Sequence, residues 1–218
     1  MPGPVQLERS PVGDGAVVTV RMHRPEARNA MDTAMLAALV DVLAETAEDD
    51  TVRGLLLTGT RGVFSAGADV REELADGGRR RMELFTTFYE TLTAFPRPTA
   101  AAVEGPAVGG GAEAAAACDV RFAGSSARFR FPGAIYGIPV GPARTVGLVG
   151  LGTAKDWVLS SRDVSALEAA QVGFVQRLVE DGDSEDAAMA WLASVASRDA
   201  ATVALLKRTF NDFSGVRD

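Results

Sequence analysis

Two short segments of small residues, each placed beside a strongly apolar run, constrain this chain more than any other feature. Residues 63–69 follow the apolar run 54–58, and residues 103–113 continue from the apolar run 99–103 into a helical pattern. Short, continuously apolar runs favour strands that are buried on both faces. Small residues let backbone N–H groups approach a ligand, and the first N–H groups of a helix lack intrahelical partners. Such loops hold a phosphate or a developing oxyanion. The alternative is a tight turn where strand and helix pack closely.

Other classes of site are excluded by what the 218 residues lack. Neither a G-x-G-x-x-G nor a G-x-x-x-x-G-K-[ST] pattern occurs. The single cysteine, Cys118, and the single histidine, His23, cannot build a disulfide framework or a Cys/His zinc site, so we expect no metal. A net charge of -7 argues against nucleic acid as a partner.

The order of the expected elements indicates an α/β fold in one domain, or in one domain with a small appendage. Apolar runs and helical spacing alternate over about the first 120 residues, and helices then predominate. Expected strands are 17–22, 54–58, 99–103 and 119–123; expected helices are 31–48 (capped by Asp32 or Thr33), 80–95, 111–118, 153–161, 165–172 and others within 184–211.

Nothing in the sequence directs the chain to a membrane or out of the cell. The segment Met1–Pro4 lacks the basic and apolar pattern of a secretory signal. Apolar stretches stay below the ~18 residues that span a bilayer. We therefore expect a soluble, cytoplasmic protein without a membrane partner.

Five ordered blocks, followed by a sixth segment, resemble the crotonase (enoyl-CoA hydratase/isomerase) family. The similarity extends from about residue 15 to residue 211. The blocks are Arg24-Pro25 with Asn29-Ala30, Phe64–Asp69, Gly109–Glu113, Cys118–Arg121 and Arg128–Pro132, and the later segment is Leu167–Val175.

This resemblance implies an architecture and a class of substrate. The expected fold is a crotonase-like spiral of ββα turns over residues 1–152, followed by a shortened C-terminal helical region over residues 153–218. Members of the family bind acyl-CoA thioesters, in fatty acid metabolism among other roles. Coenzyme A is then part of the substrate and no separate cofactor is expected. The family also implies a homotrimer or a hexamer.

The resemblance also implies the site residues. Carried over by position, the N–H groups of Ala68 and Gly110 form an oxyanion hole, and Glu113 is the acid/base. Main-chain atoms of Arg24 and Ala66 are expected to line the path of coenzyme A. The residues themselves agree with this chemistry, because the two small-residue loops can supply two amides. Glu113 has a structural alternative, since a carboxylate in the first turn of a helix is stabilised by the helix dipole.

The second acid of the family's hydratases is missing at both familiar positions. The residue after Pro132 is Gly133, and the position of the aspartate used by dienoyl-CoA isomerases is Gly141. Tyr136 lies near this position and could supply a hydroxyl, although we expect it to pack in the core. Asp69 is expected to cap a helix.

Two functional hypotheses follow. The first is an acyl-CoA enzyme (a lyase or an isomerase) in which Glu113 works alone in isomerisation, decarboxylation or an atypical hydration. The second is a non-catalytic acyl-CoA-binding or accessory protein that kept the fold and lost the chemistry.

Overall fold

A six-stranded sheet forms the centre of the structure. The computed structural model describes residues 3–138 and 141–214. The strands lie in the order β1-β2-β3-β4-β6-β9; β1 and β2 form an antiparallel hairpin, and all other neighbours are parallel. The strand bounds are β1 Val5–Val12, β2 Gly15–Met22, β3 Val52–Thr58, β4 Thr99–Val103, β6 Val120–Gly124 and β9 Arg177–Val179.

A smaller sheet completes the spiral. Its strands are β5 (Pro106–Val108), β7 (Arg128–Arg130) and β8 (Val164–Ser165), with β5 parallel to β7 and β7 antiparallel to β8. The chain passes from β4 in the large sheet to β5 in the small one and then into a helix. It repeats the step with β6 and β7. This succession is the expected crotonase-like spiral of ββα turns.

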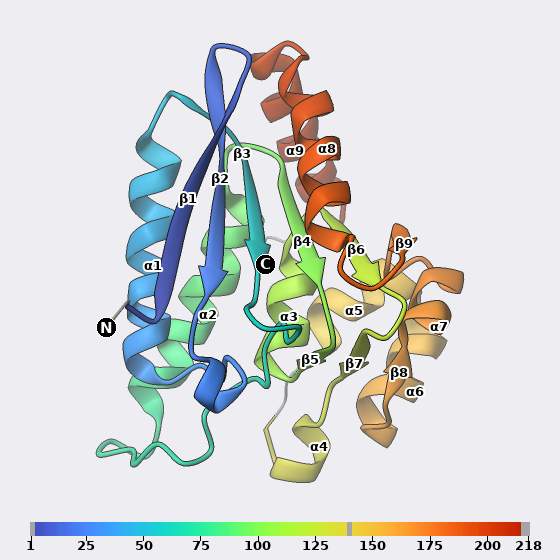
Figure 1. Ribbon diagram of the computed structural model, residues 1–218. Coiled ribbons are helices and arrows are strands. Elements are labelled where there is room, and N and C mark those ends of the chain that lie inside the picture. Colours follow the sequence, from blue (N-terminus) through green and yellow to red (C-terminus); the bar gives the residue numbers. More distant parts are fainter. Residues whose placement is uncertain (1–2, 139–140, 215–218) are drawn as a thin grey trace.

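Helices cover both faces of the large sheet (Figure 1). One face is covered by α1 (Thr33–Glu48), α2 (Arg79–Ala94) and α3 (Gly110–Ala117), and the other by α8 (Ser184–Ala196). Side chains alternate between the faces along each central strand. In β3, Leu55 and Leu57 pack in the larger core beside α1–α3, whereas Leu56 packs in the smaller core against α8. This explains why three consecutive leucines, residues 55–57, form the middle of this run.

The remaining helices follow the second ββ step. They are α4 (Gly133–Tyr136), α5 (Pro142–Val149), α6 (Leu151–Ser160), α7 (Ala166–Gln171) and α9 (Ala200–Ser214). Residues 153–214 are mostly helical but also supply β8 and β9, which pair with strands of the core. The division at residue 152 stays a prediction. In the described part of the chain, no helix has both the length and the apolar character needed to cross a membrane.

A buried arginine holds the end of α3 in place. The Arg121 side chain is 1% exposed. Its guanidinium donates to the carbonyl oxygens of Cys118 at 2.7 Å and Ala115 at 3.1 Å, both at the end of α3, and to that of Phe174 at 2.5 Å. It also lies over the Phe174 ring, 5.4 Å from the centroid. Arg121 thereby provides partners for carbonyl groups that α3 leaves free.

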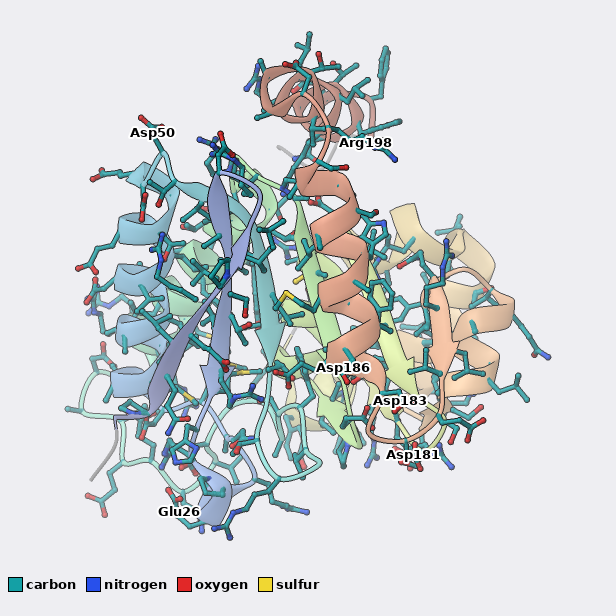
Figure 2. The ribbon with its side chains drawn as sticks, turned by 45° about the horizontal axis from the view of Figure 1, so that its top comes forward. Glu26, Asp50, Asp181, Asp183, Asp186 and Arg198 are labelled. Atoms are coloured by element: carbon teal, nitrogen blue, oxygen red, sulfur yellow. The ribbon has the colours of Figure 1, made fainter. Side chains whose placement is uncertain are left out.

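Replacing this side chain should therefore destabilise the whole domain. We expect Arg121→Met to lower the free energy of unfolding by about 3 kcal/mol, because buried carbonyls lose charged hydrogen-bond donors. The exposed Arg198, labelled in Figure 2, lies just beyond the end of α8 and provides the control Arg198→Met. Urea unfolding of both variants measures the effect, and equal stabilities would contradict this role.

Candidate active site

The two loops predicted from the sequence lie side by side. The Phe64 N–H donates to the Glu104 carbonyl at 2.8 Å, and the Ser65 N–H donates to the Pro106 carbonyl at 3.1 Å. In return, the Val108 N–H donates to the Ser65 carbonyl at 2.9 Å. These hydrogen bonds join the loop after β3 to β5 in the manner of parallel strands, and they bring Gly67 next to the start of α3.

Glycine is required at this contact because the backbones approach so closely. Gly67 has a φ of +86°, and a Cβ added there would lie 2.5 Å from the Val108 carbonyl oxygen and 3.3 Å from the Gly110 nitrogen. A Cβ on Gly111 would lie 2.7 Å from the Ser65 carbonyl oxygen. Side chains at these positions would separate the loops, so the glycines keep the amides of the two loops close together.

The N–H groups of Ala68 and Gly110 are both available to a ligand. Met31 pairs with the first loop through its N–H to the Gly67 carbonyl (2.7 Å) and through its carbonyl to the Asp69 N–H (2.9 Å). This pairing uses the groups on either side of Ala68 and leaves the N–H of Ala68 unbonded. Gly110 is the first residue of α3, where an N–H has no intrahelical acceptor. Within the described residues, neither N–H has an acceptor.

Glu113 lies in the first turn of α3 and completes the site. It lines a cavity of about 230 Å³ together with Ala68 and Gly110, so the structure brings the three predicted catalytic residues together. The walls come from α2, from the start of α3 and from the segment that leads into α5. The other lining residues are Arg81, Met82, Phe85, Thr86, Tyr89, Ile138, Gly141, Pro142, Ala143 and Arg144.

Two polar neighbours of Glu113, Arg144 and Tyr89, were not predicted from the sequence. Nη1 of Arg144 lies 3.3 Å from Oε2 of Glu113. The Arg144 guanidinium is 5.0 Å from the ring centroid of Tyr89, whose hydroxyl donates to the Gly110 carbonyl at 3.3 Å. Their sequence signal was weak. Tyr89 follows the apolar spacing of α2, and the sequence did not predict α5, the helix that carries Arg144.

Burial dominates the electrostatics of the site. The Glu113 side chain is 4% exposed, and desolvation raises the pKa of its carboxyl above the ordinary value. The Arg144 guanidinium, and then the Gly141 backbone amide, act in the opposite direction. Burial also raises the pKa of Tyr89 well above its usual value, with a further increase from the neighbouring Glu113. Tyr89 is therefore neutral at physiological pH.

The two glycines at the missing acid positions differ in conformation. Gly133 begins α4 and is not among the residues with positive φ. Gly141 has a φ of +109°, and a Cβ there would lie 2.9 Å from Val158. Tyr136 is 64% exposed and does not line the Glu113 cavity, so the expectation that it packs in the core is wrong. The chain turns away at α4, which leaves its last residues on the surface.

The remaining candidates have structural partners. The Ala66 N–H donates to the Arg28 carbonyl at 3.0 Å, immediately before the Ala68 loop. The Arg24 side chain forms ion pairs at 3.1 Å with Asp32 and with Asp69, and it lines a separate cavity of about 330 Å³. Asp69 does not cap a helix as expected: turns follow it, and its carboxylate binds Arg24 instead.

Ser65 and Cys118, the two nucleophile candidates in the sequence, have structural surroundings. Ser65 Oγ donates to the Asn29 carbonyl at 2.8 Å and accepts from the Gly67 N–H at 3.1 Å, so it fixes the loop. Burial raises the pKa of the Cys118 thiol to about 12. Across residues 3–138 and 141–214, no three His, Cys, Asp or Glu side chains gather to hold a metal ion.

Comparison with known proteins decides the family. The family model "Enoyl-CoA hydratase/isomerase" matches residues 13–215. The chain belongs to the enoyl-CoA hydratase/isomerase family. This agrees with the crotonase resemblance of its sequence motifs.

Individual relatives include proteins named as hydratases and a protein named as an isomerase. The human enoyl-CoA hydratase domain-containing protein 2, mitochondrial, is 36% identical over 185 residues, which cover 80% of this chain and 62% of the human protein. An enoyl-CoA hydratase structure from Bacillus anthracis has a TM-score of 0.91 at 28% identity, covering 96% of this chain and 83% of that one. A monofunctional enoyl-CoA isomerase structure from M. smegmatis has a TM-score of 0.83 at 31% identity, covering 99% and 94%.

Proposed function

We propose that this chain binds an acyl-CoA thioester and stabilises its enolate between the N–H groups of Ala68 and Gly110, with Glu113 as the acid/base. The observation that carries the proposal is that both amides and this carboxylate line one cavity. A hydrogen-bond donor aimed at a developing oxyanion contributes about 2.7–4 kcal/mol. The N-terminal end of α3 adds its favourable dipole at the same place.

Double-bond isomerisation is the reaction that these groups support best. Glu113 is the only carboxylate among the described residues that line the cavity. One carboxylate can remove a proton from one carbon and return it to another. Decarboxylation, which relies mainly on enolate stabilisation, is compatible with the same groups. Hydration also needs a group that orients water, and Gly133 and Gly141 offer no side chain for it.

The second candidate is a non-catalytic acyl-CoA-binding or accessory protein. It is favoured by the same two glycines, whereas the retained Glu113 favours an enzyme. Turnover of a panel of CoA thioesters, followed by mass spectrometry, separates the two. Conversion of 3-enoyl-CoA to 2-enoyl-CoA supports the enzyme, and binding without any turnover supports the alternative.

We propose that main-chain atoms of Arg24 and Ala66 line the coenzyme A path, that no further cofactor is needed, and that the protein acts in the cytoplasm, in fatty acid metabolism. The name of the human relative places that protein in mitochondria.

The oxyanion hole can be tested with a matched pair of variants. A Cβ on Gly110 would lie 2.6 Å from the Phe85 ring, so both Gly110→Ala and Gly110→Pro introduce this contact. Only proline removes the N–H, and the first position of a helix tolerates proline. We expect Gly110→Pro to isomerise 3-enoyl-CoA about 100-fold more slowly than Gly110→Ala. Equal rates in the two variants would remove Gly110 from the oxyanion hole.

Hydration of crotonyl-CoA should be slow or undetectable, because a second acid is missing. Gly133→Glu should raise it, since the backbone at Gly133 has no positive φ. Gly141→Asp is the strained counterpart and should not raise it. Crotonyl-CoA absorbance measures the rate. A wild-type turnover above about 10 per second, the median for enzymes, would show that the second carboxylate is dispensable.

The family's trimeric or hexameric assembly is supported by apolar side chains exposed on α9. These are Leu205, Leu206, Phe210 and Phe213. Exposed apolar patches of this kind mark interaction surfaces. Light scattering at micromolar concentration should give three or six copies of the 22.8 kDa chain, and Phe210→Glu should weaken the assembly. A wild-type protein that stays monomeric would contradict the proposed assembly.

A further inference from the structure

Among the described residues, a side-chain partner is found for only one of the two oxygens of the Glu113 carboxylate. Oε2 lies 3.3 Å from Nη1 of Arg144. Oε1 is buried, and no hydrogen-bond partner for it exists among the described residues. The two oxygens are therefore inequivalent: Oε2 faces a cation, and Oε1 is buried without a hydrogen-bond partner, in a residue that lines the cavity.

Arg144 is itself held in place from α2. Its guanidinium lies over the Tyr89 ring at 5.0 Å, a distance at which the ring attracts the cation. Tyr89 is 8% exposed and packs against Phe85 and Phe88 with ring centroids 5.7 Å away in each case. The Tyr89 hydroxyl donates to the Gly110 carbonyl. This chain of contacts connects Arg144 to the first residue of α3.

We propose that Arg144, supported by Tyr89, is a positioning residue for Glu113: it fixes Oε2 and presents Oε1 as the atom that takes the proton from the acyl chain. This inference rests on the proposed function. The C–H electron pair moves into the enolate, whose negative charge lies on the thioester oxygen, and the proton passes to Oε1. In isomerisation, Oε1 returns the same proton to the other end of the allylic system.

Arg144 also keeps Glu113 in the ionised form that a base requires. Burial raises the pKa of Glu113, and Arg144 is the largest influence that lowers it. The other cation lining the cavity, Arg81, is engaged elsewhere: its Nη1 donates to the Asp69 carbonyl at 2.7 Å and lies 3.2 Å from Glu72. Tyr89, from α2, is neutral. Without Arg144, the pKa of Glu113 should therefore rise further.

The consequence for activity has a definite sign. A base must be deprotonated, so turnover rises with pH through the pKa of Glu113. Loss of Arg144 should move this acid limb to higher pH. A purely structural role for Arg144 would instead lower the melting temperature or weaken acyl-CoA binding without moving the acid limb.

The first test compares kinetics across four proteins. We expect Arg144→Met to lower the turnover of 3-enoyl-CoA isomerisation about 100-fold at neutral pH, with KM nearly unchanged and the acid limb at higher pH. Arg144→Lys should restore part of the rate and move the limb back. Arg80→Met, an exposed arginine on α2, is the control and should match the wild type. An unchanged acid limb in Arg144→Met would overturn the inference.

The second test does not depend on activity. The Glu113 carboxyl is titrated by NMR in protein that carries ¹³C-labelled glutamate, and Glu113→Gln identifies the resonance. The pKa should be higher in Arg144→Met than in the wild type, with Arg144→Lys in between. Equal pKa values would overturn the role of Arg144. If the pKa of Glu113 differs between the wild type and Arg144→Met as expected, but the wild type isomerises no thioester, the proposed function is contradicted. The role of Arg144 in the ion pair then still holds.

Discussion

The hydrogen bonds between the loop after β3 and strand β5 are the contact on which the rest of the site depends. Ser65 donates to the Pro106 carbonyl and accepts from Val108, which places Gly67 against the start of α3. The amide of Ala68 then lies near that of Gly110, and Glu113 follows one turn later on α3. A shift in this pairing would separate the two amides.

Much of the fold was predictable because its central strands are buried on both faces. The run 54–58 and the run 99–103 are apolar apart from Thr58 and Thr99, and both form strands within a residue or two of the expected bounds. Strand β1 was missed because it is an edge strand, and its Glu8, Arg9 and Pro11 are typical of an edge and not of a buried run. Strands β5, β7, β8 and β9 have two or three residues each, too few for a pattern to be recognised.

The candidate site was predictable only where short local segments of the sequence carry the chemistry. Ala68, Gly110 and Glu113 lie in segments whose composition already marks them, and the structure places them together. Arg144 and Tyr89 depend on how α5 and α2 pack around α3, which no local pattern encodes. The sequence shows that a second acid is missing, but it does not reveal the cation beside Glu113. In our proposal Arg144 sets the charge and orientation of Glu113, although it cannot replace a second carboxylate.

A crystal structure with a bound acyl-CoA thioester would locate the acyl group directly. We expect the thioester oxygen to lie about 2.7–3.1 Å from the nitrogens of both Ala68 and Gly110. We also expect the acyl carbon next to the carbonyl to face Oε1 of Glu113. An acyl group seated elsewhere would contradict the proposed site. One such place is the apolar cavity of about 590 Å³ that Cys118 and Phe210 help to line. A thioester oxygen turned away from both amides would contradict it equally.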